Sequence, residues 1–365
     1  MNDSGKALRT GFTTGACAAA ATKASLSMLL SGLRVHEAVI RLPGGQYAGF
    51  SVTESRRSGI SATACVKKDG GDDPDVTSGL SICSEVSLRP DLQDGTVLFL
   101  HGEGVGTVTL AGLGIPLGEP AINPVPRTMI TGVVRTLLDR YGVSGGASVR
   151  ISVPGGAALA EKTMNARLGV LGGISIIGTS GIVVPYSGQA YLDSIRRALQ
   201  VAAENGCREL AISAGARSEN ALRSVFPGLP EHAFIHYGNR IGKTLEMIGD
   251  IGGFERVVVG VMLAKSTKLA QGELDLSSRS VGLDREFIAG LAAKTGYPES
   301  TGESIMEREL VRSVVELIPF RAHEPFYREL AEACRSTCAS VIPSIGLTFV
   351  LISQEHGCIV CPDNR

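Results

Sequence analysis

One stretch near the middle of the chain, Gly172 to Ser187, constrains the fold more than any other. It reads GGISIIGTSGIVVPYS, with a β-branched run at Ile174 to Ile177, a Gly-Thr-Ser-Gly turn, Pro185, and then a serine suited to begin a helix. A strand followed by a tight loop and a helix opens an α/β domain, in which ligands bind beyond the carboxyl ends of the strands. The patterns on either side differ, so this stretch marks a change of domain.

The residues before it predict a β-rich α+β domain with helices. A helix is expected at Ala16 to Leu30, where alanine and leucine dominate, and short strand-like runs separated by Gly, Pro and Asp follow from Ala38 to Leu113. A helix at Met129 to Tyr141 and a strand at Ser148 to Val153 complete this part. We therefore assign residues 1–160 to the first domain.

The residues after it repeat strand, loop and helix, which predicts an α/β Rossmann-like domain with a mostly parallel sheet at residues 161–365. The expected strands are Glu209 to Ser213, Ala233 to His236, Arg256 to Met262 and Gly346 to Ile352. The expected helices are Gln189 to Asn205, a short one ending at Val225, one ending near Ile251, Asp284 to Lys294, Glu303 to Glu316 and Pro325 to Thr337.

Composition narrows the class of protein. The 35 Lys and Arg residues nearly balance the 36 Asp and Glu residues, so no overall field favours nucleic acid or a membrane surface. The polar N-terminus and the polar interruptions of the apolar stretch after it argue against a signal peptide or a spanning helix. We expect a cytoplasmic protein whose eight cysteines are reduced thiols, and we leave open whether it forms a homo-oligomer.

A loop from Lys67 to Thr77, KKDGGDDPDVT, places four carboxylates within seven residues. Such crowding raises at least one carboxyl pKa unless a cation is near, so the loop can supply an acid or base, hold a cation, or bind a cationic ligand. The alternative is a solvated turn rich in Asp and Gly. The calcium-loop pattern fails, because position 12 counted from Asp69 is Leu80 and not Glu.

Two other segments suit an anionic ligand. Thr13 and Thr14 precede the first helix, whose backbone N–H groups can bind a carboxylate, although these hydroxyls can equally serve as ordinary caps. Three prolines between Gly118 and Arg127 make a rigid connector, on which Asn123 and Arg127 are held ready for a carboxylate.

Three further patterns fail or are weak. Gly102 to Gly106 lacks the spacing and the following helix of a dinucleotide site, and Gly238 to Thr244 is one residue short of a P-loop. The CxxC of Cys358 and Cys361, near His356, has no second pair, so it is a weak zinc or redox signal and we interpret it as part of an exposed tail.

Taken together, segments along nearly the whole chain resemble the cobalt-precorrin-5B (C1)-methyltransferases of the anaerobic cobalamin pathway, the CbiD family. Two departures from the family pattern are Ala264-Lys265, where Gly-Lys is usual, and Leu276-Ser277-Ser278-Arg279, where Thr-His-Ser-Arg is usual. The matching segments are TGFTTGACAAAA (10–21), KKDGGDDPDVTSG (67–79), GEGVGTVTLAGLG (102–114), GEPAINPVPRTMI (118–130), NARLGVLGGISIIGTSGIVVPYS (165–187), GNRIG (238–242) and KLAQG (268–272).

The resemblance implies methyl transfer from S-adenosylmethionine to C1 of cobalt-precorrin-5B, giving cobalt-precorrin-6A. The donor methyl is already activated, so the enzyme has to align donor and carbon and exclude water. The resemblance also implies that the cobalt arrives with the substrate, so no protein-bound metal is expected. Two rivals are a non-catalytic carrier of a tetrapyrrole intermediate and a phosphotransferase, and the latter predicts magnesium-dependent ATP binding.

The site residues follow from the resemblance and from the position of glycines after predicted strands. For the macrocycle and its acidic arms we expect Thr13, Thr14, Asn123, Arg127, Lys265 and Arg279. For the proton lost after methylation we expect Asp73 or Asp75, with solvent as the alternative. For S-adenosylmethionine we expect Gly172, Gly173, Ser175, Gly178, Thr179, Ser180, Gly215, Gly238 and Asn239.

Overall fold

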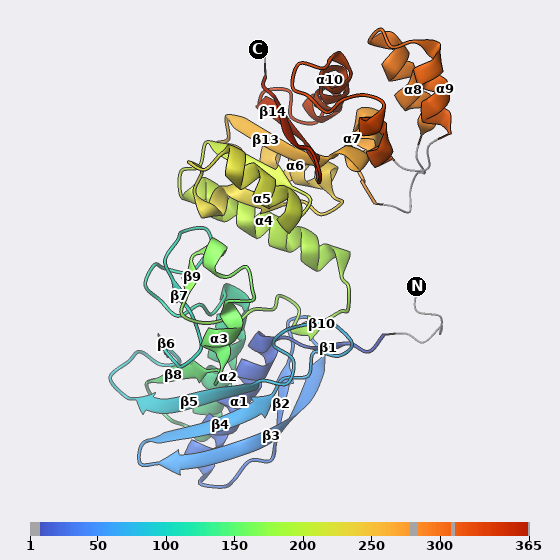
Figure 1. Ribbon diagram of the computed structural model, residues 1–365. Helices are drawn as coiled ribbons and strands as arrows, with labels where there is room; N and C mark the ends of the chain where they lie inside the picture. The colour runs from blue at the N-terminus through green and yellow to red at the C-terminus, as the bar shows by residue number, and fades with distance from the viewer. Residues whose placement is uncertain (1–7, 278–283, 308–310, 364–365) are drawn as a thin grey trace. The chain divides into compact units, whose positions relative to one another are not determined.

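The computed structural model describes residues 8–277, 284–307 and 311–363, and the chain divides into two compact units, residues 1–188 and 189–365 (Figure 1). The sequence pattern predicts the boundary at residue 160. The segment 161–188 belongs to the first unit instead, because its short strands pair with strands of that unit. Each unit has its own buried core, and each is described by itself.

The first unit is built on a mixed sheet in which every neighbouring pair is antiparallel except β6 and β8. The long strand β3 was not predicted, because its second half, Thr53 to Ser58, is polar on both faces and gives no alternation. In spatial order the strands of the described sheet are β2 (Glu37–Arg41), β3 (Tyr47–Ser58), β4 (Ser61–Lys67), β5 (Ser81–Arg89), β8 (Gly146–Ser152) and β6 (Val97–Leu100).

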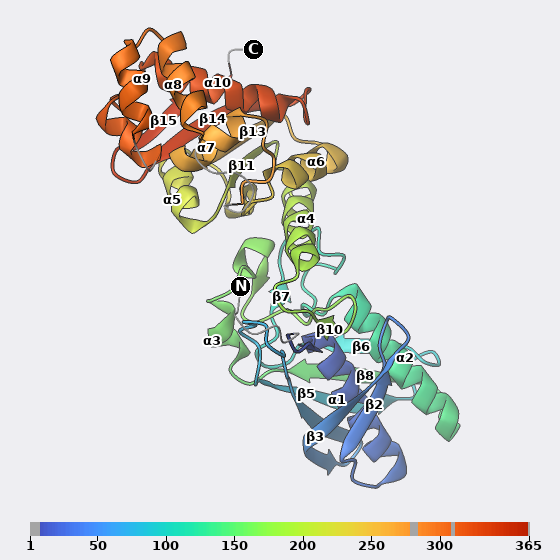
Figure 2. The same ribbon diagram turned by 90° about the vertical axis from the view of Figure 1, so that its right-hand side faces the viewer.

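Helices α1 (Thr14–Ser31) and α2 (Pro124–Tyr141) lie on one face of this sheet (Figure 2). Helix α1 contacts both the sheet and α2, and its six residues from Ala16 to Ala21 are fully buried. A helix that is buried all round has to be apolar and small on every side, which explains its run of alanines. The short helix α3 (Gly156–Ala160) follows β8.

The Gly172 to Ser187 stretch does not begin the parallel sheet, although its sequence predicted this. Ile174 and Ile176 form isolated bridges with Val105 and Ile122 in the first unit, so residues 174–177 are not a strand of the parallel sheet. The other short pairings of this unit join β1 (Gly11–Phe12) to β10 (Ile182–Val183) and β7 (Thr107–Val108) to β9 (Val170–Leu171).

The second unit contains a mostly parallel mixed sheet. Strand β15 runs antiparallel to β14, so the C-terminal segment with the CxxC is an edge strand, not the exposed tail that we expected. Its Cys361 is buried against the core, whereas Cys358 is half-buried. The spatial order is β12 (Phe234–His236), β11 (Glu209–Ser213), β13 (Arg256–Met262), β14 (Gly346–Ser353) and β15 (Gly357–Cys361).

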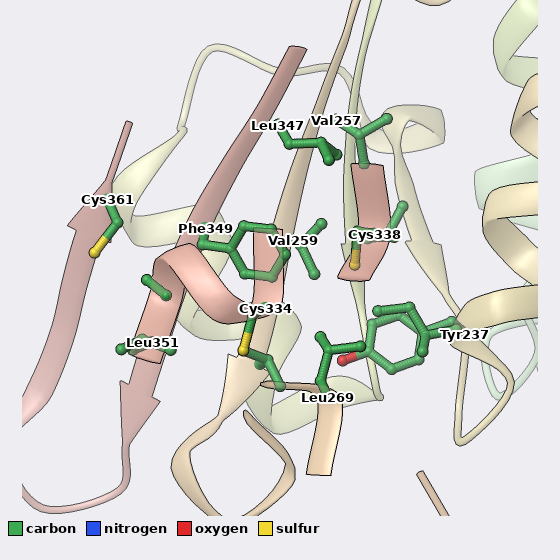
Figure 3. Close-up of a cluster of buried hydrophobic side chains, with 14 of the residues drawn as sticks. Tyr237, Val257, Val259, Leu269, Cys334, Cys338, Leu347, Phe349, Leu351 and Cys361 are labelled. Atoms are coloured by element: carbon green, nitrogen blue, oxygen red, sulfur yellow. The ribbon is translucent and has the colours of Figure 1, made fainter. Parts of the chain in front are cut away.

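Helices cover both faces of this sheet. Leu222 of α5 packs with Phe234, Val258 and Val350 on one face. The larger core lies on the other face and joins α4, α6, α7, α8 and α10 to strand residues such as Phe349 (Figure 3). The helices are α4 (Gly188–Glu204), α5 (Ala216–Val225), α6 (Ile241–Ile251), α7 (Leu263–Ala270), α8 (Arg285–Lys294), α9 (Glu299–Met306) and α10 (Pro325–Ala339), with 3₁₀ turns at 231–233 and 311–316. A further 3₁₀ turn, at 166–168, lies in the first unit.

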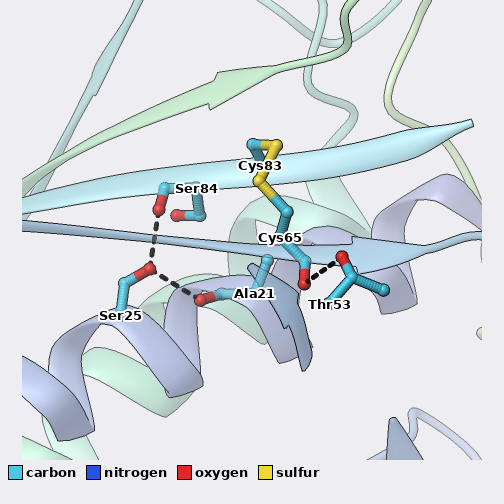
Figure 4. The surroundings of a disulfide bond; sticks show 6 residues. All are labelled: Ala21, Ser25, Thr53, Cys65, Cys83 and Ser84. Atoms are coloured by element: carbon cyan, nitrogen blue, oxygen red, sulfur yellow. Dashed lines mark hydrogen bonds between the residues drawn. A yellow bond between two sulfur atoms is a disulfide. The ribbon is translucent and has the colours of Figure 1, made fainter. Parts of the chain in front are cut away.

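Two cysteines are joined in a disulfide, which corrects the expectation that all eight are free thiols. Cys65 of β4 and Cys83 of β5 are directly opposite each other in the antiparallel ladder, with their Cα atoms 4.0 Å apart (Figure 4). The bond joins the two strands on either side of the acidic loop. None of the helices in the described part of the chain is long and apolar enough to span a membrane.

Candidate active site

Three segments that are distant in the sequence meet at the start of α1: the residues before the helix, the acidic loop and the Gly172 to Ser187 stretch. The Gly15 N–H donates to the Ile177 carbonyl (2.9 Å) and the Thr13 N–H donates to the Gly181 carbonyl (3.0 Å). The Phe12 N–H donates to the Asp69 carbonyl of the acidic loop (2.7 Å). The fold therefore assembles three of the segments that carry the family resemblance into one surface region of the first unit.

Several glycines here are required because a neighbouring segment packs directly against them. A Cβ on Gly11 would lie 2.1 Å from the carbonyl carbon of Gly70, and a Cβ on Gly178 would lie 2.2 Å from Thr13 Oγ1. A Cβ on Gly173 would likewise lie 2.5 Å from the backbone of Gly104. Close packing within the first unit thus accounts for Gly173 and Gly178 without a ligand.

Thr13 caps α1, the alternative that the sequence left open, whereas the Thr14 hydroxyl binds the backbone of the Gly172 to Ser187 stretch. Thr13 Oγ1 accepts the Ala16 N–H (3.2 Å), and Thr14 Oγ1 accepts the Ile177 N–H (2.9 Å). Both side chains are buried. The two hydroxyls fix the start of α1 against the Gly172 to Ser187 stretch.

Asp75 is bound within the acidic loop. The fully buried ammonium group of Lys68 pairs with Asp75 Oδ2 (2.6 Å), and Asp75 Oδ1 accepts the Thr77 N–H (2.8 Å) and hydroxyl (2.6 Å). Burial raises the pKa of the Asp75 carboxyl, but Lys68 and Thr77 outweigh it, so the net pKa lies below the usual value. The carboxylate therefore stays ionised and is a weak proton acceptor.

The other acidic residues of the loop hold neighbouring segments. Asp69 pairs with the Arg9 guanidinium, and the Arg9 N–H donates to Asp72 Oδ2 (2.6 Å). Asp73 Oδ1 accepts the backbone N–H of Tyr186 (3.0 Å). The crowded carboxylates are thus separated by distinct partners.

On the proline-rich connector, Arg127 is tied to its own segment. Its guanidinium donates to the carbonyls of Ile122 (2.7 Å) and Pro120 (3.0 Å), pairs with Glu119 (2.6 Å) and lies over the Phe99 ring. Asn123 is the N-cap of α2 but makes no side-chain cap bond. The contacts of Arg127 stabilise the connector and do not leave it as the open fork that the sequence suggested.

In the second unit, loops with the predicted site residues follow adjacent parallel strands. Strand β12 pairs with one side of β11, and the next strand, β13, pairs with its other side. The direction of the strand order therefore reverses at β11, and a topological switch point lies between β11 and β13. Ligands of open α/β sheets bind at such a point. Gly215 follows β11, and Lys265 lies in the first turn of α7 directly after β13.

Three of the predicted residues are joined at this edge. Lys265 Nζ donates to Asn239 Oδ1 (2.7 Å) and to the Gly238 carbonyl (3.2 Å). Burial, together with nearby Lys268, lowers the pKa of Lys265. Lys268 Nζ donates to the Ser277 carbonyl (3.0 Å), and Arg279 lies outside the described residues.

A buried polar network that was not predicted from the sequence lies beside this edge. Glu219, which is 1% exposed, pairs with Arg223 (2.7 Å) on α5 and with His236 at the end of β12. Arg223 also forms a two-point pair with Glu231 and lies over the Phe234 ring. The spacing of four residues between Glu219 and Arg223 on a predicted helix was the available signal.

The predicted donor-binding set is therefore divided. Residues 172–180 belong to the first unit and do not lie at the ends of parallel strands, which corrects the expectation drawn from their sequence. Gly215, Gly238 and Asn239 do follow parallel strands of the second unit. No cluster of three or more His, Cys, Asp or Glu residues suited to a metal ion occurs in the described ranges.

A parallel sheet with a switch point and glycine-containing loops is the arrangement of an α/β enzyme that binds a small molecule. The CbiD family model matches residues 1–185, and the model of the CbiD C-terminal domain matches residues 275–362. The chain belongs to the CbiD family.

Curated relatives match over nearly the full length. The chain is 56% identical over 357 residues to the cobalt-precorrin-5B C(1)-methyltransferase of Prosthecochloris aestuarii, covering 98% of this chain and 97% of the relative. It is 45% identical over 341 residues to the protein of the same name from Geobacillus kaustophilus, covering 93% and 90%. A crystal structure of the cobalamin biosynthesis protein (cbiD) from Archaeoglobus fulgidus matches with 28% identity and a TM-score of 0.39, over 70% of this chain and 77% of that one.

Proposed function

We propose that this chain is a cobalt-precorrin-5B C(1)-methyltransferase of cobalamin biosynthesis. The observation that carries this assignment is 56% identity across 98% of the chain to a relative of that name. A methyltransferase needs a methyl donor, and S-adenosylmethionine is the donor that we propose. Cobalt-precorrin-5B is the acceptor.

We place the donor at the switch point of the second unit. Gly215 has open space where a Cβ would point, so the loop after β11 leaves room for a ligand. Gly238 and Asn239 line the next loop, and Lys265 orients the Asn239 amide. This proposal keeps three of the predicted donor contacts and assigns Gly172, Gly173, Ser175, Gly178, Thr179 and Ser180 to the construction of the first unit.

The carboxylate arms of the macrocycle are expected to bind cationic side chains and hydrogen-bond donors. We propose Lys265 and Arg279 for this role and add Lys268, which is three residues from Lys265 on α7. Asn123 remains a candidate, because its side chain does not cap α2. For Thr13, Thr14 and Arg127 we propose a supporting role instead, since their polar atoms bind backbone or Glu119.

In the reaction the bond between sulfur and the methyl carbon breaks and its electron pair stays on sulfur. The electron pair of C1 forms the new bond to the methyl group, and a ring N–H that becomes acidic releases its proton. Of the two predicted acceptors, Asp73 is better suited than Asp75, whose pKa is lowered by Lys68 and Thr77 against the effect of burial. Water is the alternative acceptor.

Incubation of the protein with cobalt-precorrin-5B and methyl-labelled S-adenosylmethionine tests the function. We expect one labelled methyl group at C1, located by mass spectrometry and NMR. A carrier would retain the substrate unmethylated in the presence of the donor, and that result would contradict the proposal.

Calorimetry with S-adenosylhomocysteine tests the donor position. The backbone of Gly215 is extended, with φ of 163°, and a Cβ there contacts nothing, so Gly215→Val should fold normally. We expect it to weaken binding at least tenfold, because the side chain fills the proposed donor space. Thr179→Trp in the first unit is the matched control and should keep the wild-type affinity. Weakened binding in Thr179→Trp with unchanged binding in Gly215→Val would contradict this position and indicate that the donor binds at residues 172–180.

A further inference from the structure

Tyr186 has a backbone conformation that the fold alone does not require of a tyrosine. Its φ is +55°, and among the described residues it is the only one other than glycine with positive φ. A bulky side chain in this left-handed region raises the free energy of the folded state, and glycine would avoid that cost. Strain of this kind persists where the surrounding structure holds it, often at a functional site.

Two contacts within the first unit hold the segment that carries Tyr186. Asp73 Oδ1, which is 113 residues away in sequence, accepts its backbone N–H at 3.0 Å. Just before it, β10 pairs with β1. The Asp73 loop is itself fixed, because the adjacent Asp72 exchanges two backbone-anchored hydrogen bonds with Arg9.

Packing does not explain the choice of residue. The Tyr186 side chain is 74% exposed, so its ring contributes little to a core, in contrast to the fully buried Tyr237. Tyr47 on β3 is also 74% exposed, but its backbone is ordinary. Tyr186 therefore combines a strained backbone, a specific tether and an open aromatic face.

We propose that the Tyr186 ring is a stacking surface for the conjugated macrocycle of the substrate, and that Asp73 is the positioning residue that holds this ring in place. A flat π system presented to solvent on a fixed backbone loses little entropy when a planar ligand stacks on it. The inference rests on the proposed function, since it assigns a contact of the same substrate. Turnover by the wild type tests the function, and comparison among variants tests the contact.

Steady-state kinetics with cobalt-precorrin-5B distinguish a Tyr186 ring that stacks on the substrate from one that makes no contact with it. Stacking acts equally on bound substrate and transition state, so Tyr186→Ala should raise KM about three- to tenfold with kcat nearly unchanged. Tyr186→Phe keeps the ring and should resemble the wild type. Tyr47→Ala is the control of equal exposure and should leave KM unchanged.

Tyr186→Gly removes both the ring and the strain. We expect KM to rise as in Tyr186→Ala while the thermal midpoint equals or exceeds that of Tyr186→Ala. A Gly variant with wild-type KM would overturn the proposal, because the strain would then serve no contact with the substrate. If Tyr186→Ala folds poorly, the Phe and Gly variants still decide the question.

The absence of tryptophan from the chain provides a direct binding signal. Tyr186→Trp places the sole indole at the proposed surface, and stacking against a light-absorbing macrocycle should quench its emission almost completely at saturation. Tyr47→Trp should be quenched only in part. Equal quenching at the two positions would contradict a stacked geometry.

Two variants of Asp73 define its role. Asp73→Asn retains a side-chain oxygen for the Tyr186 N–H, so we expect KM near the wild type, while kcat falls because an amide cannot accept the proton that the proposed function assigns to Asp73. Asp73→Ala loses that acceptor, and KM should rise about as much as in Tyr186→Ala. A KM in Asp73→Asn that rises as much as in Asp73→Ala, or a wild-type KM in Asp73→Ala, would remove the positioning role, because KM would then not follow the acceptor of the Tyr186 N–H.

Discussion

The buried ammonium group of Lys68 organises the acidic loop by neutralising Asp75. Replacing Lys68 with Met leaves the Asp75 carboxylate, whose side chain is 21% exposed, without its cation. Removing one partner of a buried pair costs about 3–5 kcal/mol, and the partial exposure of Asp75 reduces this to about 2–3 kcal/mol. Urea unfolding measures the loss. The adjacent and exposed Lys67→Met is the control, and an equal loss there would show that the pair is not responsible.

The pair of Lys68 and Asp75 also predicts how the free energy of unfolding depends on pH. The pKa of Asp75 is lowered in the folded chain, because Lys68 and Thr77 outweigh the opposing effect of burial. Its contribution is therefore complete above the unfolded pKa of about 3.8 and is lost as pH falls below that value. The free energy of unfolding of the wild type should fall more steeply below about pH 4 than that of Asp75→Asn. Parallel slopes would refute the assignment.

At the scale of elements, β1 and the acidic loop approach so closely that Gly11 tolerates no side chain. A Cβ there would lie 2.1 Å from Gly70, so Gly11→Ala has to separate the two segments. Overpacking of this kind costs about 1–3 kcal/mol, which thermal unfolding would detect. Gly44→Ala is the control, since it has ordinary φ and no atom within 4 Å of its Cβ. Similar losses in both variants would mean that the contact is unimportant.

The disulfide between β4 and β5 should stabilise the first unit. Cys65 and Cys83 are 18 residues apart, and closing a loop of about this length in the unfolded chain contributes about 3 kcal/mol in the entropic account. Dithiothreitol should lower the thermal midpoint of the wild type and leave that of the Cys65→Ala, Cys83→Ala double variant unchanged. An equal effect of the reductant on both proteins would assign the change to something else.

Local sequence patterns predicted most elements but not how they pair. The β-branched run at Ile174 to Ile177 has strand composition, yet nothing local shows that it bridges to Val105 and Ile122 and not to a parallel strand. The edge strand β15 was missed because its CxxC suggested a tail. Among candidate site residues, the position of Gly215, Gly238 and Asn239 after strands could be predicted, because periodicity locates strand ends. The contacts that occupy Asp75 and Arg127 come from residues two to eight positions away in the same loop or connector, and nothing in the local pattern shows that these loops fold back on themselves.

At the scale of the whole molecule, strand pairing also decides where the domain boundary lies. Residues 161–188 contain strand and turn signals that are compatible with either unit. Their bonds to β1, β7 and the start of α1 assign them to the first unit, and the family model that ends at residue 185 has nearly the same boundary.

Each unit has its own buried core, so the two should fold when separated between residues 187 and 188, a cut that keeps α4 intact. We expect fragments 1–187 and 188–365 to unfold cooperatively, as followed by circular dichroism. If the donor binds at the switch point between β11 and β13, fragment 188–365 alone should bind S-adenosylhomocysteine within about tenfold of the full chain, a difference of about 1.4 kcal/mol or less. Fragment 1–187 should not bind it. Binding by the first fragment, or by neither folded fragment, would show that the donor site requires residues of the first unit.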